Sequence, residues 1–179
     1  MAAVSAHVIS TVVRLPFVLY ILFMNTTELL ILNFEEVRRR SIKVWQGIPA
    51  DYFHWKQDAE AMSLIETVRH VLECEWLYME MTKNGGSLLS DETPFNPRSY
   101  TNVADEITFA EPHRQKFLEF VASFTDEDLT TKKIERRDKG YVRTVGDFLL
   151  RVAYHESVHA GQVLNNLRVA GVPRPNIWD

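Results

Sequence analysis

The spacing of apolar side chains along the chain predicts four long helices. The first covers residues 28–46, where apolar or small residues recur three and four positions apart, as in the inward stripe of a bundle helix. These positions are Leu30, Phe34, Val37, Ser41 and Val44. Thr26 or Thr27 can cap the start of this helix, and Gly47 and Pro49 end it.

The second helix has a clear start, because Ser63 is followed three residues later by Glu66 in the arrangement of a capping box. It runs to about residue 83, and Gly85 and Gly86 end it. The connection before this helix carries three aromatic residues that we expect to close one end of the core: Tyr52, Phe53 and Trp55. The connection after it, residues 87–102, is irregular and contains two prolines.

The third helix is expected over residues 105–123, with core bulk from Phe109, Phe117, Phe120 and Phe124. Pro112 falls inside this span, and a proline inside a helix removes a hydrogen bond and clashes with the preceding turn. The sequence therefore predicts that the helix either is split at Pro112 or starts there.

Residues 130–144 alternate like a pair of strands, with a hairpin turn at Asp138-Lys139-Gly140. The last helix follows over residues 145–170 and is closed by Gly171 and Pro173. Four helices, one long connection and one connection that contains a hairpin predict an all-α fold. We expect a four-helix bundle with crossovers and a short hairpin-like insertion before the last helix.

The first 24 residues differ from the rest, because Arg14 is their only charged side chain and residues 15–24 read LPFVLYILFM. Arg14 and Pro16 interrupt the run, which is too short for a membrane span of about 20 residues. A secretory signal would need a basic start and a small-residue cleavage site, and neither is clear. We favour a natural start at Met24, with a packed or membrane-touching extension as the alternatives, so the domain is expected over residues 25–179.

Composition excludes some classes of function. The chain of 179 residues has a net charge of −4 with acidic and basic residues mixed, so no nucleic-acid surface is expected. The densest basic run, Arg38 to Arg40, is interpreted as a solvated helix face.

Cys74 is the single cysteine, which rules out an intrachain disulfide and fits a reducing, cytoplasmic location. It lies in an apolar stretch and is expected to be a small core side chain.

Two histidines one helical turn apart carry the chemistry. His155 and His159 lie four residues apart, so their imidazoles share one face of the last helix and can chelate one ion. Neutral imidazole suits zinc, nickel, iron and copper. The pair continues a line of inward positions: Phe148, Val152, His155, His159, Gln162 and Asn166. Two buried imidazoles without partners would cost free energy, which favours a metal site.

His70 on the second helix is the best candidate for a third ligand, since it lies near the edge of an inward line formed by Thr67, His70, Cys74, Leu77 and Met81. Three histidines leave metal positions open, which is typical of catalytic rather than structural sites. Glu73, about one turn beyond His70, is a candidate for orienting it or handling a proton, and a surface acid is the competing interpretation. The other histidines, His7, His54 and His113, are assigned no metal role.

The segment HESVH also matches the H-E-x-x-H pattern of zinc proteases, in which Glu156 would be the catalytic base. Three observations oppose that interpretation. Gly161 stands two rather than three residues after His159, and no further histidine follows. The only acid after His159 is Asp179, so a downstream glutamate ligand is lacking. The upstream chain is also helical, whereas such proteases build a sheet from it.

The sequence resembles the DinB/YfiT-like superfamily of metal-dependent proteins. The matching parts are SLIETVRHVLECEWLY around His70, HESVHAGQ around His155 and His159, and FHWK before the second helix. The resemblance implies an up-down-down-up bundle, often dimeric, in which one histidine of the second helix and an H-x-x-x-H pair of the last hold zinc or nickel with water completing the shell. Related proteins include thiol-dependent transferases and isomerases that use bacillithiol, mycothiol or glutathione.

The leading hypothesis is therefore a metal-dependent enzyme that transfers a low-molecular-weight thiol to an electrophile, since coordination deprotonates thiols. Metal-dependent hydrolysis of a small-molecule substrate is a variant. A non-catalytic metal-binding stress or scaffold protein would carry the same three histidines and is the alternative from another class. The expected partners are a small-molecule substrate and a second copy of the chain, without nucleic acid or a stable membrane span.

Overall fold

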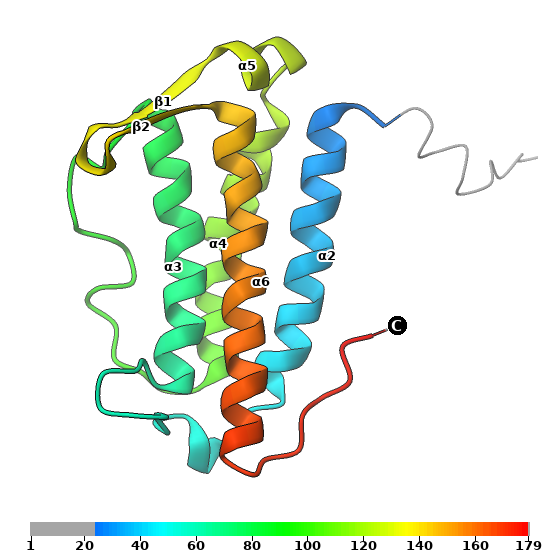
Figure 1. Ribbon diagram of the computed structural model, residues 1–179, viewed down its shortest axis with the longest axis vertical. Coiled ribbons are helices and arrows are strands. Elements are labelled where there is room, and N and C mark those ends of the chain that lie inside the picture. Colours follow the sequence, from blue (N-terminus) through cyan, green and yellow to red (C-terminus); the bar gives the residue numbers. More distant parts are fainter. Residues whose placement is uncertain (1–23, 179) are drawn as a thin grey trace, which may run out of the picture.

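The computed structural model describes residues 24–178, in which four long helices pack side by side (Figure 1). They are α2 (Thr26–Gln46), α3 (Leu64–Lys83), α4 (Val103–Ala122) and α6 (Val145–Val169). The predicted all-α class and the four helix positions are confirmed, with ends that agree to within about two residues. The prediction about residues 1–23 lies outside the described part of the chain.

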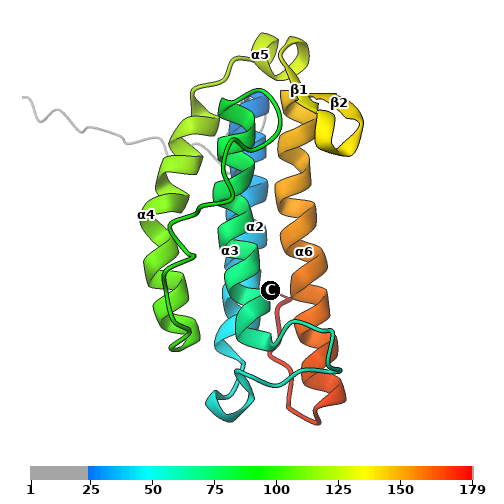
Figure 2. The ribbon, with the colours of Figure 1, turned by 90° about the vertical axis from the view of Figure 1, so that its left-hand side faces the viewer.

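The helices follow the up-down-down-up order. α2 and α6 run in one direction, and α3 and α4 run in the other (Figures 1 and 2). α2 packs against α6 and α4, and α3 packs against the same two helices. Because α3 and α4 are parallel neighbours, residues 84–102 must return along the full length of the bundle before α4 can begin, which explains the long irregular connection.

Local capping fixes where the helices begin. The side chains of Asn25 and Ser63 each accept a hydrogen bond from a backbone N–H of the first turn, and Glu28 and Glu66 complete reciprocal capping boxes. Asn25, rather than Thr26 or Thr27, therefore caps the first helix. Within residues 24–178 no helix combines the length and the apolar character that a membrane crossing requires.

The core has two halves along the bundle axis. One half contains Phe34, Phe117 and Phe148 near the hairpin, and the other contains Trp45, Leu64 and Leu167 at the opposite end. The aromatic residues of the first connection pack against the second half, as predicted: Tyr52, Phe53 and Trp55. The metal-site candidates lie between the two halves, on the side where α3 faces α6.

Two elements differ from the prediction. α4 continues through Pro112 without a break. Both sides of the proline are held by neighbours, since Ala110 and Phe117 are buried and Arg114 bonds to other helices, and this packing outweighs one lost hydrogen bond. The chain also forms a short helix, α5 (Asp126–Thr131), whose Thr125–Asp128 capping box was not recognised in the sequence.

The predicted hairpin is present but shorter than expected. Its strands are β1 (Lys133–Arg136) and β2 (Tyr141–Thr144), and they pair antiparallel. Residues 130 and 131, which were expected to open the first strand, belong to α5 instead. Gly140 closes the turn with a φ of 69°, a conformation that favours glycine.

Candidate metal centre

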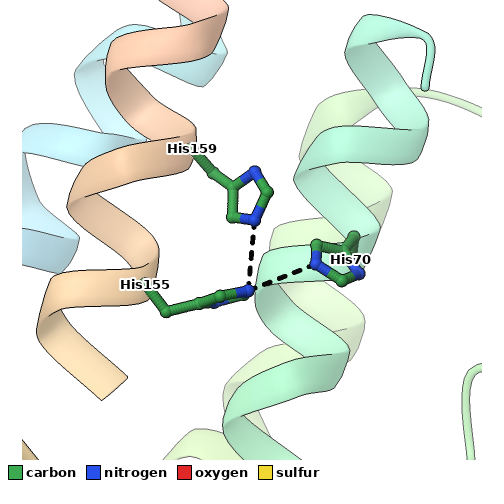
Figure 3. A group of neighbouring side chains, drawn as sticks. All are labelled: His70, His155 and His159. Atoms are coloured by element: carbon green, nitrogen blue, oxygen red, sulfur yellow. Dashed lines mark hydrogen bonds between the residues drawn. The ribbon is translucent and has the colours of Figure 1, made fainter. Parts of the chain in front are cut away.

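The structure brings the three predicted histidines together from two antiparallel helices. His70 projects from α3, and His155 and His159 project from successive turns of α6 (Figure 3). The Nε2 atom of His155 lies 3.2 Å from Nε2 of His70 and 3.1 Å from Nε2 of His159. The ligand nitrogens of the three histidines all lie within 4.8 Å of one another. Among residues 24–178, no other group of three or more histidine, cysteine or acidic side chains converges in this way.

These distances fit one bound divalent ion. Zinc–nitrogen bonds of about 2.0–2.1 Å in a tetrahedral arrangement place ligand nitrogens about 3.3–3.4 Å apart. The two separations from His155 are within about 0.3 Å of that spacing, and the nitrogens of His70 and His159 lie within 4.8 Å of each other, so these two rings would move closer together around a bound ion. All three rings are half-buried rather than fully buried, which leaves one side of the cluster open to solvent.

The surroundings favour the neutral imidazoles of His155 and His70, the form that metal binding requires. Burial, together with repulsion between cations at the neighbouring His159 and His70, lowers the pKa of His155 to about 4. Burial also lowers the pKa of His70, with His159 as the second cause. At neutral pH these rings therefore carry lone pairs rather than positive charges.

Gln162 forms a hydrogen bond with the ring nitrogen of His159 that faces away from the cluster. Nδ1 of His159 lies 2.7 Å from the Oε1 oxygen of Gln162, one turn further along α6. An amide oxygen only accepts, so Nδ1 carries the proton and Nε2 presents its lone pair to the cluster. The sequence placed Gln162 in the inward line of α6, but the side chain is exposed and orients His159 at the rim of the bundle.

Cys74 lies beside the cluster rather than in the core. Its Sγ atom is 3.7 Å from both ring nitrogens of His70, one turn earlier on α3. The prediction of a small core side chain was therefore wrong, because the edge of the α3 stripe opens towards the histidines at this level. Burial raises the pKa of the thiol to about 12, so it stays protonated and is a poor nucleophile.

Two clefts adjoin the cluster. The first, of about 420 Å³, is lined by both His70 and Glu73 together with Tyr100 and Met62. Glu73 accepts a hydrogen bond from the hydroxyl of Thr93, which holds its carboxylate in this cleft. The second cleft, of about 530 Å³, shares Met62 with the first and has an uncharged polar lining that includes Gln57, Gln162, Asn165 and Asn166. The first cleft reaches His70 directly, and the second reaches Gln162, the hydrogen-bond partner of His159.

Glu156, the would-be base of the protease pattern, points away from the histidines. It is 3 % exposed and accepts two hydrogen bonds from the guanidinium of Arg38, at 2.8 and 3.0 Å. Adjacent residues on a helix are rotated by about 100°, so a carboxylate next to His155 enters the bundle interior. A buried carboxylate tied to an arginine cannot act as a base at the cluster, and the protease interpretation is excluded on geometry.

Arg38 is part of a buried charge cluster that the sequence did not predict. The cluster consists of one residue from each long helix: Arg38, Glu75, Arg114 and Glu156. Arg38 also reaches Glu75 at 3.3 Å, and Arg114 donates to the same carboxylate at 2.6 Å. Burial raises the pKa of Glu75, and the two arginines oppose that rise. The expectation that residues 38–40 form a solvated face is therefore wrong for Arg38, whose partners lie far away in sequence.

The remaining histidines lie elsewhere, as expected for two of them. His54 is exposed in the first connection, and His113 packs against the rings of Phe95 and Phe109. His7 precedes the described residues. The three histidines that converge were thus predicted from the sequence, while the contact of Gln162 with His159 and the buried ion pair of Arg38 depend on the fold.

Comparisons with known proteins agree with this architecture. A DinB-like protein of Bacillus subtilis, YjoA, superposes with a TM-score of 0.62 at 21 % identity, covering 83 % of this chain and 96 % of that one. YfiT from Bacillus subtilis, described as a probable metal-dependent hydrolase with an unusual four-helix bundle topology, gives a TM-score of 0.63 at 11 % identity, covering 84 % and 91 %. These likenesses establish a shared fold.

No curated protein matches the sequence. The family model described as the DinB superfamily, in contrast, matches residues 33–163. This range includes His70, His155 and His159 and most of the bundle. The chain therefore belongs to the DinB superfamily.

Proposed function

We propose that His70, His155 and His159 bind one divalent metal ion and that the protein is a metal-dependent enzyme acting on a small molecule. The observation that carries this proposal is the convergence of three Nε2 atoms, with separations of 3.1 and 3.2 Å, beside two open clefts. Three protein ligands with access from solvent are typical of a catalytic centre, whereas structural zinc sites use four. Zinc and nickel are the metals that the family resemblance favours.

The leading reaction is transfer of a low-molecular-weight thiol, such as bacillithiol, mycothiol or glutathione, to an electrophile. A bound divalent ion would supply Lewis acidity that favours the deprotonated form of a thiol. The protein's own groups would orient the reactants: Gln162 fixes the ring of His159, and the two clefts hold the thiol and the electrophile. Glu73 would take up the proton, and its position in the same cleft as His70 supports this role.

Hydrolysis is the second candidate. YfiT, which shares the fold, is described as a probable metal-dependent hydrolase. The carboxylate of Glu73 favours this chemistry equally, because a base beside the cluster can accept the proton of an attacking water. A metal-binding scaffold without turnover is the outcome expected if the bound ion has no exchangeable position.

Three further expectations belong to this proposal. A homodimer is supported by apolar side chains that stay exposed on one face of α6, Leu150, Tyr154 and Val158. A cytoplasmic location fits a chain whose single cysteine cannot form an intrachain disulfide. Nucleic acid is not expected as a partner at a net charge of −4.

Cobalt-substituted protein provides the test. A thiol that binds the ion should produce a sulfur-to-metal charge-transfer band at pH values below the pKa of the free thiol. The band should be absent in the His155→Ala variant. Turnover with an electrophile should require both metal and thiol. If bacillithiol, mycothiol, glutathione, coenzyme A and cysteine all leave the spectrum unchanged, the transferase proposal fails and hydrolysis becomes the better one. A closed shell without exchangeable water would leave only the scaffold.

A further inference from the structure

The buried charge cluster lies at the same level of the bundle as the three histidines. Glu156 stands between His155 and His159 in sequence, on the turn of α6 that carries both rings. Glu75 lies on α3, the helix that carries His70. The two acids face the bundle interior while the histidines face the groove between α3 and α6, so the same two helix segments carry both sets of groups.

Arg38 connects these two segments directly. Its Nε and Nη2 atoms donate to the two carboxylate oxygens of Glu156, and Nη2 also reaches Glu75. Two parallel hydrogen bonds to one carboxylate define a plane and therefore fix rotation as well as distance. Arg38 lies on α2, so its two bonds fix the α6 turn against α2, and its single bond to Glu75 at 3.3 Å links this turn to α3. Arg114 anchors the same carboxylate of Glu75 to α4.

A small rotation of α6 would disrupt the histidine cluster. Side-chain tips lie about 5–6 Å from a helix axis, so a turn of about 10° displaces an imidazole nitrogen by about 1 Å. Functional groups must usually be held within about 0.5 Å of their working geometry. The three nitrogens come from two helices, and nothing within the pair on α6 controls the position of this pair relative to His70.

We propose that Arg38 and Glu156 are positioning residues, which hold α6 against α3 so that His155 and His159 meet His70 at the spacing of one metal ion. This inference rests on the proposed function, because it assigns the cluster to that metal site. Stability alone does not account for four buried charges, since well-packed apolar residues of similar volume are commonly as stabilising or more so. Geometric control is what a bidentate ion pair adds.

A second buried ion pair offers a matched control. Glu106 on α4 is fully buried and accepts two hydrogen bonds from Arg69 on α3. The other hydrogen bonds of Arg69 go to the carbonyls of Arg98 and Ser99 in the connection before α4, so this pair joins α3 to α4 rather than to α6. Glu156→Gln and Glu106→Gln each replace a buried carboxylate by an amide of the same shape and leave an arginine short of its counter-charge. Both variants should lose thermal stability, whereas a selective effect on metal binding requires the proposed positioning role.

The experiment measures the affinity for zinc by chelator competition and the absorption spectrum of the cobalt form in both variants. We expect Glu156→Gln to lose about 10–100-fold in affinity, the range found for residues that orient metal ligands, and to alter the cobalt spectrum. Glu106→Gln should keep the wild-type spectrum and stay within about threefold in affinity. Equal zinc affinities in the two variants would overturn the positioning role of Glu156, while the proposal of a metal site would still stand.

The double variant Arg38→Met/Glu156→Met separates geometry from stability, including the case in which Glu156→Gln does not fold. It removes both charges together and leaves Glu75 paired with Arg114, so its stability should recover. Its zinc affinity should stay about tenfold or more below wild type. Recovery of wild-type affinity and spectrum would show that the cluster only stabilises the fold. Wild-type protein that takes up no metal at all would instead refute the proposed function itself.

Discussion

Removing His155 should abolish most of the stability that the protein gains from metal. His155 is the central ligand, since its Nε2 atom is the one that lies next to both other nitrogens. An ion that binds only the native state stabilises it by about 2.7–4.1 kcal/mol when free metal exceeds Kd by 100- to 1,000-fold. For a chain of this length each kcal/mol raises Tm by about 2–4 °C, so saturating zinc should raise the wild-type Tm by about 5–16 °C.

The assay compares Tm with and without zinc and measures the bound metal by elemental analysis. Wild type should hold about one ion per chain, as a single three-ligand site requires. His155→Ala and His159→Ala should lose tight binding and the zinc-dependent shift, and His70→Ala should weaken both strongly, because it leaves only the pair on α6. His54→Ala, which removes an exposed histidine outside the cluster, is the control and should behave as wild type. Full metal content in the His155→Ala/His159→Ala double variant would refute this reasoning.

Three further predictions concern the site and the ends of two helices. Glu73→Gln should lower turnover by about 100-fold or more and leave the metal content unchanged, because the carboxylate that accepts a proton is removed. Loss of metal in this variant would show instead that Glu73 is a ligand. Ser63→Ala should cost about 0.5–2 kcal/mol in urea unfolding, because the capping bond to the N–H of Glu66 is lost, and an unchanged midpoint would contradict that role. A chain that starts at Met24 should keep its metal content and Tm, since Asn25 already caps α2, and a loss of several degrees would make the preceding residues part of the fold.

The helices and the histidine cluster were predictable because their signals are local. Capping at Ser63 and the glycines after residue 83 define α3 almost to the residue. The four-residue spacing of His155 and His159 fixes their common face on any α-helix. The pairing with His70 needed only one further assumption, that α3 and α6 are neighbours, and the bundle fold supplies it.

The missed features depend on partners that are distant in sequence. Arg38 looks like part of a solvated run because its two acidic partners are 37 and 118 residues away. The continuous course of α4 through Pro112 depends on neighbouring helices that hold both of its halves. α5 is a different case, because the Thr125–Asp128 capping box is a local signal for a helix, whereas the alternating residues that follow it favour strands.

The role of Glu156 shows why a motif of correct spacing can carry different chemistry in different folds. The H-E-x-x-H spacing guarantees only that two histidines share a face and that the glutamate lies about 100° from the first of them. In this bundle that direction leads into the interior, where a carboxylate is tolerated only with a counter-charge, and Arg38 provides it. The three histidines, in contrast, are only half-buried, and His70 lines a cleft that solvent reaches. One turn of α6 therefore combines a binding surface with an interior ion pair, and a substitution on either side of that turn should be measured for both metal affinity and stability.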